Sequence, residues 1–148
     1  MRLPALFLIC CFFTSVSLAQ HNGGDGAYLI LPPSEINRIH GVIGGQVAAF
    51  RQGDMARAFS YAAPDIQRTF GDPDRFGTMV AQGYGPIFAA FRFEFIALIG
   101  TRDQPIQVVN FVGEDLTSVT ALYLMELQPD GQWRIAGVQI APTSQQAI

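Results

Sequence analysis

The sequence predicts an α+β domain in which about three helices precede an antiparallel sheet of about four strands. Apolar residues recur every three or four positions up to about Gly83, and the period changes to two from about Phe91. Near the C-terminus, Pro129-Asp130-Gly131-Gln132 separates two β-rich runs and is typical of a hairpin turn. Helices and strands do not alternate, which disfavours a doubly wound parallel sheet.

The first helix is expected to begin at Ser34, which is a good N-cap residue and precedes an acidic first turn. Its apolar stripe consists of Ile36, Ile39, Ile43, Val47 and Phe50. Gly41, Gly44 and Gly45 weaken this helix by roughly 1 kcal/mol each relative to alanine. These glycines would let another element approach the helix closely.

Start and stop signals divide the rest of the helical half. They are, in chain order, Gly53 with Asp54, Ala63-Pro64, Gly71 with Asp72-Pro73, and Gly83. Glycine after a helix can adopt the left-handed conformation that ends it, and aspartate before a helix can accept a hydrogen bond from its first N–H groups. Proline suits the first helical position because its φ is already helical. These signals predict a second helix after Asp54 with one or two further turns to Phe70, and a third helix from Pro73.

The first strand carries one strongly aromatic face. The residues predicted on this face are Phe91, Phe93, Phe95, Ala97 and Ile99. Arg92 and Glu94 alternate with them, so we expect the phenylalanines to point inward and this charged pair to be solvated. The next strands are predicted from Ile106 to Val112, from Val119 to Leu127 and from Trp133 to Ile140, with Trp133 as a packing residue.

The N-terminus has the pattern of a secretory signal peptide, with Arg2, an apolar run from Leu3 to Phe13, and small residues before Gln20. We therefore expect cleavage near Ala19 and a periplasmic or secreted protein. The apolar run is short for a span of about 20 residues, but an uncleaved anchor remains the alternative. The predicted organisation is a signal peptide at 1–19, a flexible leader at 20–33, one domain at 34–141 and a polar tail at 142–148.

Composition excludes several function classes for the exported chain. Both cysteines, Cys10 and Cys11, lie in the signal segment, so the mature chain would have no disulfide or thiol nucleophile. The net charge is −3, and loss of Arg2 would make it more negative. No basic stripe is present, which disfavours nucleic acid or an anionic membrane surface as partner.

Several stretches together resemble a bacterial family called a domain of unknown function, DUF4864. They are Ala49–Asp54, Ala58–Gly71, Met79-Val80 with Gly83-Tyr84, Ala121–Leu127 and Asp130–Val138. The closing Asp-Gly-x-Trp-Arg-Ile is also similar to the NTF2-like, or cystatin-like, superfamily. That resemblance implies a cone, in which a bent sheet wraps round the first helix with a cavity between them. It supplies no catalytic residues to transfer.

Few residues qualify for catalysis, and we predict no catalytic set, no metal site and no cofactor. His40 lies at the border of the first apolar stripe, where a half-exposed structural histidine is the simpler interpretation. Ser60, His40 and Asp65 could form a triad on paper, but no nucleophile elbow selects them. An enzyme would have to use Asp65, Glu94 or His40 in the cavity.

Five residues are candidates for ligand binding at a cavity rim: Tyr61, Asp65, Arg68, Tyr84 and Tyr123. Asp65 and Arg68 are also helical neighbours three positions apart, so an ion pair between them is the structural alternative.

Two functions remain open from the sequence. The first is an exported, non-catalytic domain that binds a small apolar ligand or a protein partner. The second is a small enzyme of the isomerase or dehydratase type, with a buried carboxylate or histidine in the cone. A homodimer formed sheet to sheet is also compatible with an outer face that carries Arg92, Thr120 and Arg134.

Overall fold

The computed structural model describes residues 28–141 and confirms the α+β prediction. The predicted signal peptide, most of the predicted leader and the predicted polar tail fall outside the described residues. The helices are α1 (Pro33–Arg51), α2 (Met55–Ser60), α3 (Pro64–Phe70), α4 (Pro73–Gly83) and α5 (Gly85–Phe88). The strands are β1 (Arg92–Gly100), β2 (Pro105–Val112), β3 (Ser118–Leu127) and β4 (Trp133–Ile140).

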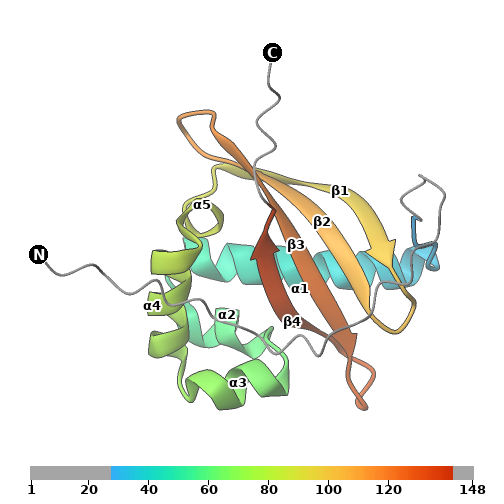
Figure 1. Ribbon diagram of the computed structural model, residues 1–148. Coiled ribbons are helices and arrows are strands. Elements are labelled where there is room, and N and C mark those ends of the chain that lie inside the picture. The colour runs from blue at the N-terminus through green and yellow to red at the C-terminus, as the bar shows by residue number, and fades with distance from the viewer. Residues whose placement is uncertain (1–27, 142–148) are drawn as a thin grey trace, which may run out of the picture.

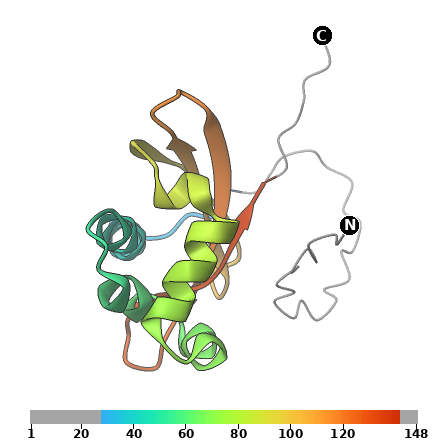
Figure 2. The ribbon, with the colours of Figure 1, turned by 90° about the vertical axis from the view of Figure 1, so that its left-hand side faces the viewer.

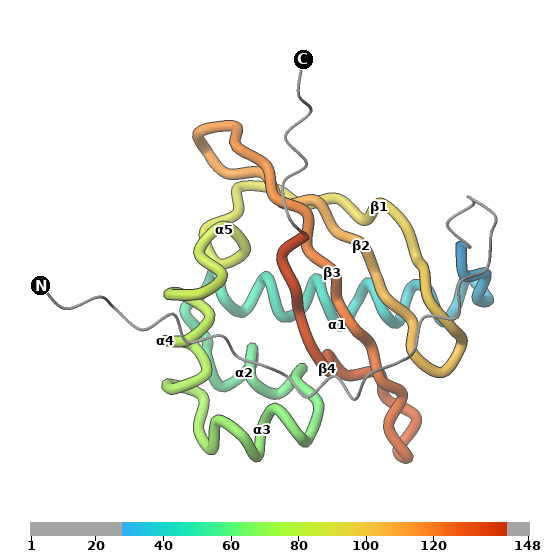
Figure 3. Tube along the Cα trace, in the orientation of Figure 1, coloured from blue at the N-terminus to red at the C-terminus, as the bar shows by residue number. Residues whose placement is uncertain are grey.

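The four strands form one antiparallel meander in the order β1-β2-β3-β4, and α1 crosses one face of it (Figure 1). From α5 the chain runs across to β1, the strand farthest from α2–α5, so that β4 returns beside those helices (Figure 3). Figure 2, which looks from the helical side, places α4 in front of β4. The last strand therefore forms the boundary between the sheet and the helical layer.

The start of α1 differs from the expectation at Ser34. The helix begins at Pro33, its N-cap residue is Pro32, and no side chain caps it. The backbone N–H groups of Glu35 and Ile36 donate instead to the Pro32 carbonyl, at 2.9 and 3.2 Å. Proline suits the first helical position because it has no N–H to satisfy and its φ is already helical.

The apolar stripe of α1 packs on the inner face of the sheet as predicted. Ile39, Ile43 and Val47 are completely buried against sheet residues that include Phe111 and Tyr123. Each fully buried aliphatic side chain contributes about 1.5–3 kcal/mol by removal of apolar area from water. The centre of the domain is therefore a filled core.

Gly45 explains how Tyr61 can pack against α1. A Cβ atom at this position would lie 2.4 Å from the Tyr61 hydroxyl oxygen and 2.5 Å from the adjoining ring carbon. These distances are well inside van der Waals contact, so a side chain here would displace the tyrosine. The predicted close approach at the glycines of α1 is confirmed at this position.

The caps predicted for the later helices are confirmed. The Asp54 carboxylate accepts from the Arg57 N–H at 3.0 Å, and the Asp72 carboxylate accepts from the Arg75 N–H at 2.9 Å. Gly71 ends α3 with a φ of 76°. The short helix α5, between α4 and the first strand, was not predicted.

The alternation predicted along β1 is wrong beyond Phe95. The register with β2 shifts between Phe95 and Ala97, so Ile96 is an additional residue and is 55% exposed. A bulge of this kind reverses the faces of the residues that follow it. Leu98 therefore takes the inward position, whereas the prediction had placed Ala97 and Ile99 on that face. Phe91 lies before the strand and is also exposed.

The C-terminal hairpin turn has the predicted chemistry. Gly131 adopts a φ of 78°, and the Asp130 carboxylate accepts from the Gln132 N–H at 2.8 Å. Trp133, directly after the turn, is 4% exposed and donates its indole N–H to the Glu35 carboxylate at 2.8 Å. This bond joins the hairpin to the first turn of α1.

Candidate functional site

A pocket of about 700 Å³ lies where α3 and α4 face β3 and β4, beside the filled core. We call it the apolar pocket. Hydrophobic residues and glycine make up most of its wall: Phe50, Ala62, Ile66, Phe70, Phe76, Met79, Val80, Gly83, Ile87, Ile106, Leu122, Leu124, Ile135, Ala136, Gly137, Val138 and Ile140. Gln46, Tyr84, Tyr123 and Gln139 complete it. The volume lies within the range of about 300–1,000 Å³ that is typical of ligand pockets.

A cluster of phenylalanine rings fixes the helical wall of this pocket. Phe76 is 5% exposed, and its ring centroid lies 5.2 Å from that of Phe59, 5.7 Å from that of Phe70 and 6.0 Å from that of Phe50. The Phe59 ring is tilted to that of Phe76 and the Phe70 ring meets it edge-on, whereas the Phe50 ring is stacked at an interplanar angle of 27°. Offset-stacked and edge-on pairs are the arrangements that aromatic rings prefer. Neighbouring helices are therefore held together by the side chains that line the pocket.

The sheet wall comes mainly from β4. Every residue from Ile135 to Ile140 contributes to the pocket. The order of strands leaves β4 at the edge of the sheet. Hydrogen bonds from the helical half cross to it in this stretch: the Ile135 N–H donates to the Tyr61 carbonyl at 2.9 Å, the Ala63 N–H donates to the Ile135 carbonyl at 2.8 Å, and the Tyr84 hydroxyl donates to the Val138 carbonyl at 3.0 Å. The pocket follows this edge of β4, and α1 contributes Gln46 and Phe50 to its wall.

Two of the polar side chains in the wall donate hydrogen bonds within the protein. Gln46 is 3% exposed, and its amide nitrogen donates to the Ala58 carbonyl at 3.1 Å. Tyr84 uses its hydroxyl hydrogen on Val138. Gln139 is exposed and lies at the rim. The bonds of Gln46 and Tyr84 fix the position of these side chains in the wall.

Tyr123 differs from these residues. It is 1% exposed and lines the pocket, yet its hydroxyl takes part in none of the hydrogen bonds found within residues 28–141. Burial raises its pKa, and the nearby Tyr84 raises it further. The hydroxyl therefore remains protonated at any physiological pH and can donate a hydrogen bond into the pocket.

The wall of the apolar pocket has no charged side chain and no histidine or cysteine among the residues of 28–141 that form it. Nor does any group of three or more His, Cys, Asp or Glu within that range have the arrangement needed to hold a metal ion. In the same part of the chain, every helix is too short or too polar to cross a membrane.

The structure brings two of the five predicted ligand-binding residues together, Tyr84 and Tyr123. Tyr61 instead packs against Gly45 and lies outside the wall of the apolar pocket. Asp65 and Arg68 form an exposed ion pair, with 83% and 71% of their side chains accessible. Such a pair is worth little to stability, and it lies outside the pocket wall.

The three residues that an enzyme would need are also outside the pocket. Glu94 and Asp65 are exposed. His40 stacks on Phe95 with ring centroids 3.7 Å apart, and its Nε2 lies 3.1 Å from the Gln107 side-chain oxygen. Burial lowers the pKa of His40, although the bond to Gln107 opposes this effect. These contacts give His40 a packing role at β1 and β2.

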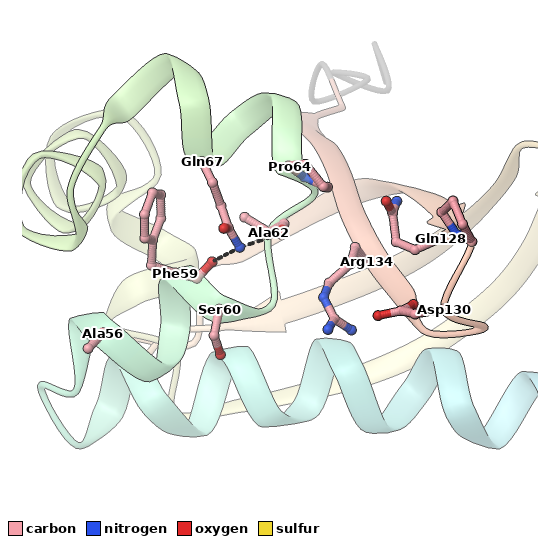
Figure 4. A pocket seen from close by; sticks show the side chains of 10 residues that line it. Ala56, Phe59, Ser60, Ala62, Pro64, Gln67, Gln128, Asp130 and Arg134 are labelled. Carbon is pink, nitrogen blue, oxygen red and sulfur yellow. Dashed lines mark hydrogen bonds between the residues drawn. The ribbon is translucent and has the colours of Figure 1, made fainter.

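A second pocket, of about 540 Å³, lies between α2, α3 and the β3–β4 turn (Figure 4). We call it the polar cleft. The Gln67 amide donates to the Ala62 carbonyl at 2.9 Å and to the Phe59 carbonyl at 3.2 Å. Figure 4 shows the side chains of Arg134 and Asp130 pointing toward one another at the other end of the cleft.

Several wall residues of the apolar pocket were not predicted as a site. Ile66, Met79, Leu122 and Leu124 read as ordinary core positions, because periodicity assigns a residue to a face but does not say whether that face is filled. The available signal was that β3 carries apolar residues on both faces. A strand of that kind must have something apolar, or an empty space, on its second side.

No curated protein and no solved structure matches this chain. The model of one family, described as a domain of unknown function (DUF4864), matches residues 34–148. That range covers the whole folded domain described above, from the first turn of α1 to beyond the end of β4. The chain therefore belongs to the DUF4864 family.

Proposed function

We propose that this protein is a non-catalytic binding domain whose apolar pocket takes a small apolar ligand. The observation that carries the proposal is the pocket itself: about 700 Å³ of space, walled largely by hydrophobic side chains, in a domain whose central core is filled. Protein interiors are normally packed like organic crystals, with few voids larger than a water molecule. A space of this size beside the core is more typical of a binding site than of imperfect packing.

The chemistry of the wall supports binding over catalysis. General acid or base catalysis needs a titratable group within reach of the substrate. The titratable side chains in the wall, within the part of the chain that the structure describes, are Tyr84 and Tyr123. The isomerase or dehydratase alternative would need Asp65, Glu94 or His40 in the pocket, and none of the three lines it.

The signal-peptide pattern of residues 1–19 supports a place of action outside the cytoplasm. In the periplasm or medium, the domain would meet apolar molecules that have crossed or left a membrane. It would bind them without disulfides, since both cysteines lie in the segment that is removed.

The proposal is tested by titrating the purified protein with N-phenyl-1-naphthylamine, a neutral dye that fluoresces when it leaves water. We expect saturable binding of about one dye per chain. The Gly137→Phe variant, which places a ring in the pocket, should lose this binding while its circular dichroism stays native. Absence of saturable binding, or equal binding by the folded variant, would overturn the proposal.

A further inference from the structure

We propose that the apolar pocket selects neutral ligands that carry a hydrogen-bond acceptor oxygen, such as ketones or esters, and that the Tyr123 hydroxyl binds this oxygen. This inference rests on the proposed function, because it names the class of ligand for the same pocket. It follows from the hydrogen bonds that the polar side chains in the wall of the pocket make within the protein.

Among the described buried side chains of the wall, Tyr123 is the donor that no protein acceptor uses. The Gln46 amide nitrogen donates to the Ala58 carbonyl, and the Tyr84 hydroxyl donates to the Val138 carbonyl. The side chain of Tyr123 is 99% buried, lines the pocket and has no hydrogen-bond partner within residues 28–141. A donor that lines the pocket and serves no protein acceptor is available to a ligand. A ligand oxygen placed opposite it would accept this hydrogen bond.

The position of Tyr123 makes it a fixed donor. It lies on β3, which pairs with β2 on one side and β4 on the other. Its ring packs near that of Phe111, with centroids 6.2 Å apart. The side chain is therefore held before a ligand arrives, and little conformational entropy is lost on binding.

The absence of charge in the wall decides against acids and amines. A carboxylate moved from water into this pocket would meet no cationic side chain among the described wall residues, and one hydroxyl does not replace its hydration. An ammonium group would meet no anion there for the same reason. Tyr123 stays protonated because burial raises its pKa, so it offers a donor and not a phenolate.

The test compares three naphthalenes of nearly equal size: 2-acetylnaphthalene, 2-ethylnaphthalene and 2-naphthoate. Each displaces N-phenyl-1-naphthylamine from the wild-type protein at pH 8. We expect the ketone to bind at least about tenfold more tightly than the carboxylate, because the carboxylate loses its hydration without a counter-ion. The carbonyl stretch of the bound ketone should shift to lower frequency than in hexane, as a hydrogen-bonded carbonyl does.

The variant Tyr123→Phe identifies the donor. It should lower the affinity for the ketone relative to the ethyl compound by about two- to tenfold, which is the net value of one neutral hydrogen bond. Tyr28→Phe is the matched control, since Tyr28 is 76% exposed and lies outside the pocket; its ratio of affinities should equal that of the wild type. If Tyr123→Phe does not fold, two wild-type measurements still test the proposal: the infrared shift of the bound ketone, and the ratio of the affinities for the ketone and the carboxylate.

The outcomes separate the two proposals. If the dye and all three naphthalenes fail to bind, the proposed function is wrong and this inference falls with it. If the dye binds but the carboxylate competes as well as the ketone, or the carbonyl stretch is unshifted, this inference alone is overturned. An affinity ratio that Tyr123→Phe leaves unchanged would also overturn it.

Discussion

The apolar pocket and the polar cleft both border one short segment. Tyr61, Ala62 and Ala63 run parallel to β4: the Ile135 N–H donates to the Tyr61 carbonyl at 2.9 Å, and the Ala63 N–H donates to the Ile135 carbonyl at 2.8 Å. Ala62 lines both spaces. The same few residues thus cover part of the edge of the sheet and border two sites that differ in polarity.

The two sites differ in what holds their walls. The apolar pocket is walled by side chains whose own packing stabilises the domain, such as the ring cluster around Phe76. The polar cleft is walled by helix ends and a turn, and its groups hydrogen-bond mainly to their own neighbourhood, as Gln67 does with Ala62. In the apolar pocket, binding and stability depend on the same residues. Substitutions in the polar cleft should therefore have a smaller effect on both.

The strongest test of this difference is to remove a ring from the pocket wall. Phe76→Ala should lower the free energy of unfolding by about 3–5 kcal/mol, since the residue is 5% exposed and contacts three other rings. Ala56→Ser, at an exposed position on the polar cleft, should stay within about 0.5 kcal/mol of the wild type. Urea unfolding followed by circular dichroism measures both, and equal stabilities would contradict the comparison.

Filling each site separately is the next test. Gly137 lines the apolar pocket on a strand, and a Cβ atom there would meet nothing closer than the Leu124 Cβ at 4.0 Å. Gly137→Phe should therefore be tolerated, because phenylalanine favours strands, and should weaken dye binding by at least about tenfold. Ala56→Phe places the same ring in the polar cleft and should leave dye affinity within about twofold. A loss of binding in the second variant would assign the dye to the cleft.

Much of the architecture could be predicted from the sequence because local rules decide it. Asp54 and Asp72 cap helices as aspartate does before a helix, and Asp130-Gly131 forms the turn that its dihedral preferences dictate. The start of α1 was misplaced by one residue, since proline and serine compete for adjacent positions there. The bulge at Ile96 was missed because an additional residue in a strand depends on its partner strand.

The candidate site was less predictable for a related reason. Tyr84 and Tyr123 were singled out for their hydroxyls, and they meet at the pocket although they lie 39 positions apart in the chain. Asp65 and Arg68 were chosen for their charge and form an exposed pair instead. Periodicity identifies which side chains face inward, but the space left between inward faces depends on how the elements are placed relative to one another.

Within the polar cleft, two glutamines differ in whether their side-chain amide nitrogen has a hydrogen-bond partner. Gln67 makes two hydrogen bonds to carbonyl groups, whereas the Gln128 amide nitrogen is buried without a partner among the described residues. Gln67→Met should lower the free energy of unfolding by about 1 kcal/mol, because it removes satisfied bonds. Gln128→Met should be neutral or slightly stabilising, because it removes an unsatisfied donor of the same shape. Equal effects of the two substitutions would contradict the assigned hydrogen bonds.

The smallest expected effect is a dependence of the unfolding free energy on pH that dye binding does not share. Burial lowers the pKa of His40 in the folded protein, so the unfolded chain takes up this proton first. The contribution of His40 to stability is therefore complete above about pH 6.5 and is lost as the pH falls toward the folded-state pKa. The lowered pKa of Glu35, which its bond to Trp133 mainly causes, acts in a more acidic range, below about pH 4.5.

Unfolding by urea at pH 7.5 and pH 5.5 should show this loss in the wild type and a weaker one in His40→Gln, which cannot titrate. Dye affinity should stay constant over the same range, because no group in the wall of the apolar pocket within residues 28–141 titrates there. If dye binding followed the same pH curve as stability, the pocket would be coupled to His40 across the sheet. The two regions would then not be independent.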